Sequence, residues 1–516
     1  MKRAGAVSAL VGLGLYLALL LLYRLGEIPG LHGDEAWSGH FAMRLLERGF
    51  YTPHEMNGYT GAFYGWAVSK SYGLFGVNAF ALRLPGVLAN LVAAAIVAVE
   101  FGAWFGLGAA AGWLGLVALW PMFLMKSRVA WEVYALQGLF LSIDLALLRG
   151  FLERRDFRPA RALAFLLVNA FGVFNHFIFL SVPLSLLLLA TAQFYYEEKP
   201  ELADLVRLAA ACAAACTALC AVKLNLSEAF WGAHRVAGAA ALLAPLAAAL
   251  AAFLARPEAA NARLRSLAHM LRAERPAWGH AVARVLALGW LVSAALHGTA
   301  LVQIGSGVAI FKRMFSHSLP LWASAPLHLW AGFLLAACAA LAVRAWREEE
   351  TFGPTERFLA LWPAVYFCLF SAFRTNNSIR YYAIVSFLIT AALGAGLWRV
   401  VDVRRWRFRA AAALAFALLH GFLWRELIHP VDRPPFRFRV GWHMERSAHF
   451  MRKEPLYDVA RAQRACLMDG DGGFIDLPVK FYMYERPFPC DLGAAIRFDY
   501  CPECARAPYF RWGISR

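Results

Sequence analysis

Two adjacent carboxylates, Asp34 and Glu35, are the residues of this chain best placed to do chemistry. They stand in the stretch LHGDEAW over residues 31–37. A carboxylate within reach of a hydroxyl group can take its proton as a general base, and a second carboxylate can orient that group or help to hold a metal ion. We therefore predict Asp34 as a base and Glu35 as an orienting or metal-binding group. The alternative is that Asp34 only caps a helix that begins at Glu35.

The acidic pair follows an apolar segment, residues 5–23, that is long enough to cross a bilayer, which takes about 20 residues. Lys2 and Arg3 precede this segment. Because cytoplasmic flanks of membrane spans carry excess positive charge, the N-terminus is expected in the cytoplasm and the acidic pair on the exported side.

The composition excludes a soluble globular protein. Of 516 residues, 60% are hydrophobic and only 16% are charged, and the mean hydropathy is +0.52. These values predict an all-α polytopic membrane protein. Thirteen spans are expected, over residues 5–23, 80–102, 107–125, 131–150, 162–174, 177–194, 205–222, 236–254, 282–303, 326–342, 358–373, 381–398 and 410–424.

The net charge of +17 agrees with this topology. Arginines gather in the connections at residues 149–161, 255–284 and 399–409, all of which are cytoplasmic if the N-terminus is. The charge therefore indicates a multi-pass protein of the inner (plasma) membrane, and no nucleic-acid partner is expected.

The tail differs in character from the transmembrane domain predicted over residues 1–428. An odd number of spans places residues 429–516 outside, where we expect a small exported α+β domain. It carries Cys466, Cys490, Cys501 and Cys504. In an oxidising compartment these cysteines could form two disulfides in three pairings, whereas the spacing of Cys501 and Cys504 also suits half of a zinc site.

The long first exported loop, residues 26–79, is expected to hold two helices at the membrane surface. Residues 35–48 form an amphipathic pattern with Trp37, Phe41 and Leu45 on one face. Residues 59–75 are rich in tyrosine, phenylalanine and tryptophan, which favour the headgroup layer. Such helices would hold Asp34 and Glu35 close to lipid headgroups.

The order of these features resembles a known family. An exported Asp-Glu pair after the first span, two interfacial helices and then the stretch LFGVNAFALRLP over residues 74–85 are similar to the GT-C superfamily of membrane glycosyltransferases. The similarity is greatest to its family-39-like branch, which includes protein O-mannosyltransferases and lipid A aminoarabinose transferases. Thirteen spans followed by an exported domain also resemble the latter group.

The resemblance implies an enzyme that moves a sugar from a polyprenyl-phosphate donor to a lipid, glycan or protein acceptor on the exported side, with inversion at the anomeric carbon (EC 2.4 class). In that family the acidic pair of the first loop acts as base or metal ligand, and it maps onto Asp34 and Glu35 here. A divalent metal ion is the one cofactor that the resemblance suggests.

The resemblance also suggests residues for the donor phosphate and sugar. The family places an arginine against the carrier phosphate where this chain has Arg128, and Glu132 would orient it; the alternative is an arginine that anchors a helix end. His176, Arg380 and Tyr381 are further donor-contacting candidates, with polar packing or membrane anchoring as their alternatives. Many family members carry a further acidic residue after the first interfacial helix, and Glu55 aligns approximately with it. Glu55 is therefore a candidate for binding the acceptor or a metal ion.

Two other classes of protein fit parts of the pattern. A transporter or flippase for lipid-linked solutes would show internal repeats and helices broken near mid-membrane, and we find no convincing repeat. An inactive lipid-binding scaffold of the cell envelope would tolerate loss of Asp34, which an enzyme would not.

Overall fold

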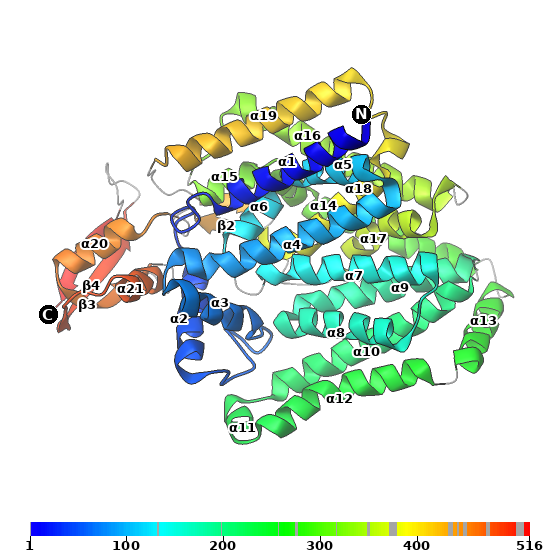
Figure 1. Ribbon diagram of the computed structural model, residues 1–516, viewed down its shortest axis with the longest axis horizontal. Coiled ribbons are helices and arrows are strands. Elements are labelled where there is room, and N and C mark those ends of the chain that lie inside the picture. Colours follow the sequence, from blue (N-terminus) through cyan, green and yellow to red (C-terminus); the bar gives the residue numbers. More distant parts are fainter. Residues whose placement is uncertain are drawn as a thin grey trace.

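The computed structural model describes residues 2–131, 134–197, 199–255, 257–273, 277–315, 317–347, 351–370, 379–431, 437–440, 443–446, 451–470, 475–501 and 510–515. Long helices that lie roughly along one direction dominate the molecule (Figure 1). A small group of strands and short helices near the C-terminus lies at one end of this bundle (Figure 1).

Helices occupy every one of the thirteen expected spans. In chain order they are α1 (Lys2–Leu22), α4 (Ala79–Phe105), α5 (Leu107–Ala118) with α6 (Pro121–Arg128), α7 (Tyr134–Arg154), α8 (Pro159–Asn175), η1 (Phe177–Leu180) with α9 (Ser181–Glu197), α10 (Pro200–Asn225), α12 (Arg235–Leu254), α14 (Ala277–Gly305), α16 (Leu321–Arg347), α17 (Pro354–Phe370), α18 (Ala383–Val400) and α19 (Trp406–Ile428). Within the described residues, nine helices are long and apolar enough to cross a membrane, or ten if a bent pair counts as one span. The chain is therefore an α-helical multi-pass membrane protein, and thirteen crossings stay a prediction.

The third expected span is not one straight helix. Its two parts, α5 and α6, are bent by 70° with respect to each other. Trp120 is extended, with φ −114° and ψ 90°, and Pro121 opens α6. A proline disfavours helical backbone in the residue before it and suits the first turn of a new helix, so the break follows from the sequence Trp120-Pro121.

The expected pair of helices in the first loop is present as α2 (Gly33–Arg48) and α3 (Phe63–Phe75). Both lie at the end of the bundle that faces the C-terminal strands (Figure 1). They pack closely, since a Cβ atom on Gly65 of α3 would come within 2.5 Å of the Phe41 ring on α2. α3 begins four residues later than the aromatic pattern suggests, because residues 59–62 form a turn instead.

The C-terminal part contains two small sheets and two helices. Strands β1 (Arg437–Val440) and β2 (His443–Arg446) form an antiparallel pair. Strand β4 (Asp491–Tyr500) runs parallel to β3 (Ala465–Gly470) and antiparallel to β5 (Phe510–Ser515). Helices α20 (Glu454–Ala462) and α21 (Asp476–Glu485) accompany the larger sheet.

The three described cysteines of this part are disulfide-bonded. A disulfide joins Cys466 on β3 to Cys490, next to β4. Cys501 is also disulfide-bonded, and Cys504 lies outside the described residues. Because a disulfide sulfur cannot serve as a thiolate ligand, the structure favours the disulfide interpretation over the zinc site.

Three further helices connect the long ones. They are α11 (Glu228–Ala233), α13 (Pro257–Ala273) and α15 (Val308–Met314).

Candidate active site

The start of α2 is fixed by a reciprocal cap. His32, in extended conformation, accepts a hydrogen bond at Nδ1 from the backbone N–H of Asp34 at 3.0 Å. The backbone N–H of His32 donates in turn to Oε2 of Glu35 at 3.1 Å. The helix thus begins at Gly33 with His32 as its cap, so the alternative that Asp34 caps a helix starting at Glu35 is wrong.

Glu35 is the structural member of the acidic pair. Its side chain is fully buried and forms an ion pair with Arg83 of α4, whose Nε lies 2.9 Å from Oε1 and whose Nη2 lies 3.0 Å from Oε2. The backbone N–H of Ala130 donates to Oε1 at 2.7 Å. With His32, four N–H groups of the described residues converge on two carboxylate oxygens. Glu35 therefore joins the start of α2 to α4 and to the segment after α6.

These contacts bear on the expected metal ion. Both oxygens of Glu35 already accept strong hydrogen bonds. Across the part of the chain that the structure describes, no three His, Cys, Asp or Glu side chains are grouped so that they could hold a metal. The described residues around the acidic pair therefore do not form a metal site.

Asp34 has a different environment from its neighbour. Its side chain is 23% exposed, and Oδ2 lies 3.7 Å from Nδ1 of His32. A partly exposed carboxylate on a fixed helix start can still reach a substrate, whereas a fully buried one cannot. Of the two predicted residues, Asp34 is thus the more accessible, and its role as a base stays a prediction.

The start of α2 is linked to an arginine by way of the Trp131 ring, which contacts both His32 and Arg313. The Trp131 ring meets the His32 ring edge-on, with centroids 5.9 Å apart. On the other side, the guanidinium carbon of Arg313, in α15, lies 4.5 Å from the Trp131 ring centroid. Arg313 is only 1% exposed. Its sequence context did not distinguish it from other exported basic residues, because its partner Trp131 is far away in the chain.

Arg128 has a structural task in this fold. It is 1% exposed at the end of α6. Its Nη1 donates to the carbonyl of Leu20 at 2.6 Å, and its Nη2 donates to the carbonyls of Tyr23 at 3.0 Å and Ile28 at 2.8 Å. It thereby satisfies carbonyls that the end of α1 leaves without helical partners. The expected orienting residue, Glu132, lies outside the described residues.

The structure brings two of the donor-contacting candidates together. His176 is buried, and its Nε2 lies 3.0 Å from the hydroxyl of Tyr134. The ring of Tyr381 meets Tyr134 from another side, with centroids 5.7 Å apart. The ring of Tyr59, in the first loop, meets the ring of His176 edge-on, with centroids 5.3 Å apart. Arg380 belongs to η3 (Ile379–Tyr382), and its side chain lies outside the described part.

Glu55 lies against α2. Ser38, one turn after Glu35, donates its hydroxyl to Oε1 of Glu55, which is 7% exposed. The turn that carries Glu55 is closed by the bridge between His54 and Gly61. Gly61 is required there, since a Cβ would approach the Phe174 carbonyl oxygen to 2.2 Å.

Glu35 and Glu55 also share a neighbour. Tyr64 of α3 is fully buried and donates its hydroxyl to the carbonyl of Leu82 at 3.0 Å. Burial first, and then the carboxylates of Glu35 and Glu55, raise the pKa of Tyr64 well above its usual value. The two buried acids therefore flank one phenol, and Glu55 belongs to the same unit as the acidic pair.

The C-terminal part contributes to this site from the other end of the chain. Lys453, just before α20, is fully buried and donates its Nζ to the carbonyl of Leu31 at 3.1 Å. Burial lowers the pKa of Lys453 to about 7. Close by, a Cβ on Gly30 would lie 2.0 Å from the carbonyl oxygen of Met451, so only glycine fits. No local sequence pattern indicates this contact, because 422 residues separate its partners.

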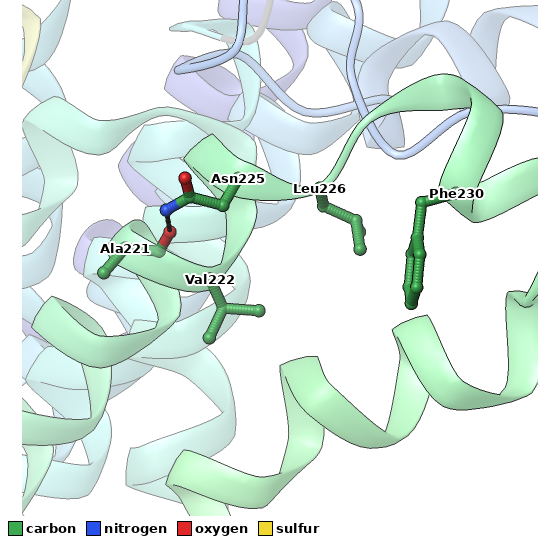
Figure 2. A pocket seen from close by; sticks show the side chains of 5 residues that line it. All are labelled: Ala221, Val222, Asn225, Leu226 and Phe230. Atoms are coloured by element: carbon green, nitrogen blue, oxygen red, sulfur yellow. Dashed lines mark hydrogen bonds between the residues drawn. The ribbon is translucent and has the colours of Figure 1, made fainter.

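A small apolar pocket lies beside the Glu55 turn. It has a volume of about 440 Å³ and is lined by Ala221, Val222, Asn225, Leu226 and Phe230, where α10 turns into α11. Figure 2 shows the Asn225 side chain turned back onto Ala221, to whose carbonyl it donates at 2.8 Å. The carbonyl of Leu226 accepts a hydrogen bond from Nε2 of His54 at 2.8 Å, which ties the pocket to the first loop.

The fold is similar to solved membrane glycosyltransferases. No family model and no curated protein sequence matches the chain. Among solved structures, ArnT from Cupriavidus metallidurans in the apo state matches with a TM-score of 0.52 at 13% identity, over 96% of this chain and 93% of that one. The Archaeoglobus fulgidus oligosaccharyltransferase in the apo form matches with a TM-score of 0.52 at 15% identity, over 95% of this chain but only 60% of that one.

ArnT, a lipid A aminoarabinose transferase, and the archaeal oligosaccharyltransferase are both GT-C enzymes. The fold that the first loop suggested is thus confirmed, with its polytopic helices and its small C-terminal sheet. At these identities the likeness concerns the fold and leaves the substrate open. The chain therefore shares its overall fold with these two solved structures.

Proposed function

We propose that the chain is an inverting glycosyltransferase that moves a sugar from a polyprenyl-phosphate donor to a lipid, glycan or protein acceptor. The observation that carries this proposal is the division of labour within the acidic pair. Glu35 is fully buried and holds the helix start, whereas Asp34 beside it is partly exposed. In a GT-C fold, this arrangement suits one carboxylate that meets substrate.

Asp34 would take the proton of the acceptor hydroxyl while the acceptor oxygen attacks the anomeric carbon. The bond between that carbon and the phosphate oxygen breaks, and the polyprenyl phosphate leaves with the electron pair. Because attack and departure occur on opposite faces of the sugar, the configuration inverts. His32 and Glu35 keep the backbone of Asp34 in place during this step.

We assign the cation that faces the leaving phosphate to Arg313. Its buried guanidinium stacks on Trp131, which contacts His32 at the start of α2. Arg128, the residue that the family resemblance suggests, donates to the carbonyl of Leu20 at the end of α1 and to that of Ile28 in the segment after it. An arginine engaged in this way stabilises the frame of the site, so its effect on the phosphate would be indirect.

The remaining candidates would serve the donor sugar and the acceptor. His176 and Tyr381 meet through Tyr134 and could contact the sugar, and Glu55 could contact the acceptor. A structure of the archaeal oligosaccharyltransferase with a TM-score of 0.50 holds a tethered acceptor peptide that contains an NVT sequon. Another, with a TM-score of 0.51, holds zinc and sulfate. Neither feature identifies the acceptor or a metal for this chain.

We further propose that the protein is a multi-pass protein of the inner membrane, with a cytoplasmic N-terminus and an exported C-terminal domain over residues 429–516. The disulfide between Cys466 and Cys490 supports this orientation, because disulfides persist in oxidising compartments.

The test is Asp34→Asn in the purified full chain, with a lipid-extract donor pool and a radiolabelled sugar. Loss of a general base reduces turnover by about 10²–10⁴-fold, while folding and donor binding should remain. Glu47→Gln, which removes an exposed carboxylate from the same helix, is the matched control and should keep full activity. Full activity of Asp34→Asn would overturn the assignment of Asp34 as the base. Absence of transfer by the unmodified chain would instead favour a transporter or an inactive scaffold.

A further inference from the structure

A groove of about 840 Å³ lies between α16 and α19, beside the end of α18. Its walls are mainly apolar and include three aromatic side chains, Trp330, Phe333 and Phe408. The rings of Trp330 and Phe408 lie 5.7 Å apart, and those of Trp330 and Phe333 lie 5.8 Å apart. Leu329 and Leu414, which also line it, are 75% and 53% exposed, so the groove is open on the outer surface of the bundle.

This groove is separate from the candidate active site. The last turn of α19 lies beside the first loop, since Arg24 donates to the carbonyl of Leu427 at 3.1 Å. The groove is at the other end of α19, near its first residues. A helix of 23 residues spans roughly 34 Å, and Figure 1 shows α19 running along the bundle away from α2 and α3.

The rim of the groove is positively charged. Arg405 is 76% exposed and lies 3.4 Å from Asp402, and Arg407 lies over the ring of Trp406 at 5.9 Å. With Arg404 and Arg409, the segment of residues 402–409 carries four arginines against one aspartate. Trp406 is 73% exposed, which is typical of a ring at the boundary between lipid and water.

An apolar groove that ends at a cationic rim near this boundary matches an amphiphile with a negative head. We propose that the groove binds an anionic phospholipid, with one acyl chain along Trp330, Phe333 and Phe408 and the headgroup phosphate on Arg405 and Arg407. The volume is within the range of pockets that bind ligands of this size, about 300–1,000 Å³. Asp402 already engages Arg405, so Arg407 contributes the less neutralised cation. A basic pocket between membrane helices is a known mode of lipid headgroup recognition.

The charge pattern distinguishes among the lipids of a bilayer. A net positive rim is neutralised by phosphatidylglycerol, whereas phosphatidylcholine brings its own cation next to the arginines. Free phosphate would leave the aromatic walls uncovered. The site therefore requires both the chain and the net negative head.

The test is native mass spectrometry of the purified full chain titrated with phosphatidylglycerol or phosphatidylcholine. Phosphatidylglycerol should bind more tightly, and the double variant Arg405→Ala with Arg407→Ala should weaken it by about tenfold. Ala411→Phe, at an exposed lining residue, should weaken it by filling the groove without changing the charge. Arg263→Ala with Arg265→Ala, which removes two exposed arginines on α13, is the matched control and should bind like the unmodified chain.

Equal binding of both lipids would overturn the proposed headgroup preference, and unchanged binding in both groove variants would overturn the site. If a polyprenyl phosphate competed for the groove with equal affinity, the proposal of a phospholipid as the occupant would be overturned. The assay measures lipid binding and needs no transfer activity, so its outcome is independent of the proposed function.

Discussion

Glu35→Gln should destabilise the protein far more than Asp34→Asn, although the two acids are neighbours. Glutamine removes the charge that Arg83 faces and turns an amide N–H₂ group toward donors. Arg83 is 1% exposed, so it would become an uncompensated buried charge. Breaking a buried ion pair from one side costs about 3–5 kcal/mol. That is a large part of the roughly 5–15 kcal/mol by which folded proteins are stable.

Asp34→Asn should behave differently, because the Asp34 side chain is 23% exposed and its carboxylate lies 3.7 Å from Nδ1 of His32, beyond hydrogen-bonding distance. Exposed pairs contribute about 0–1 kcal/mol, so this variant should unfold nearly like the unmodified chain. The assay is thermal unfolding of each variant purified in the same detergent, with Glu47→Gln as the exposed-acid control. Arg83→Met combined with Glu35→Met should recover part of the loss, since an apolar pair leaves no buried charge. If Glu35→Gln unfolded at the same temperature as the unmodified chain, the structural role of Glu35 would be refuted.

Two further predictions concern the C-terminal part. Burial lowers the pKa of Lys453 to about 7, so the unfolded chain binds more protons than the folded one between about pH 7 and the ordinary pKa of 10.5; stability against proteolysis of the C-terminal part should therefore rise with pH across that window, and Lys453→Met should flatten the rise. Cys466 and Cys490 should react with a membrane-impermeant maleimide in intact cells only after an impermeant reductant has been added; labelling that requires permeabilised cells would contradict an exported tail.

The fold was largely predictable because its signals are local. Apolar stretches of sufficient length predict membrane helices whatever they pack against, and each predicted span is occupied by one helix or by two successive helical segments. The break at Pro121 was also readable, because proline acts on its own backbone and on the residue before it. Treating residues 107–125 as one span overlooked this signal.

The roles of the site residues were less predictable, because their partners are distant in the chain. Arg83 lies 48 residues from Glu35, and Ala130 lies 95 residues from it. The carbonyls that Arg128 reaches are 100 or more residues away. Residue type alone could not show whether an arginine beside a membrane helix faces a phosphate or a helix end, since both offer oxygen acceptors to the same guanidinium.

The two acids of the pair act together, because Glu35 holds the helix start on which Asp34 lies. A base is effective only when it is held in hydrogen-bonding position, and loops hold side chains less accurately than packed elements do. Here the start of α2 is bound from three directions: by Arg83 of α4, by the backbone at Ala130, and by Lys453 of the C-terminal part through Leu31. Glu35 receives the first two of these contacts. Because an acid that is buried to this extent cannot reach substrate, we propose that Asp34 performs the chemistry that the resemblance assigns to the pair.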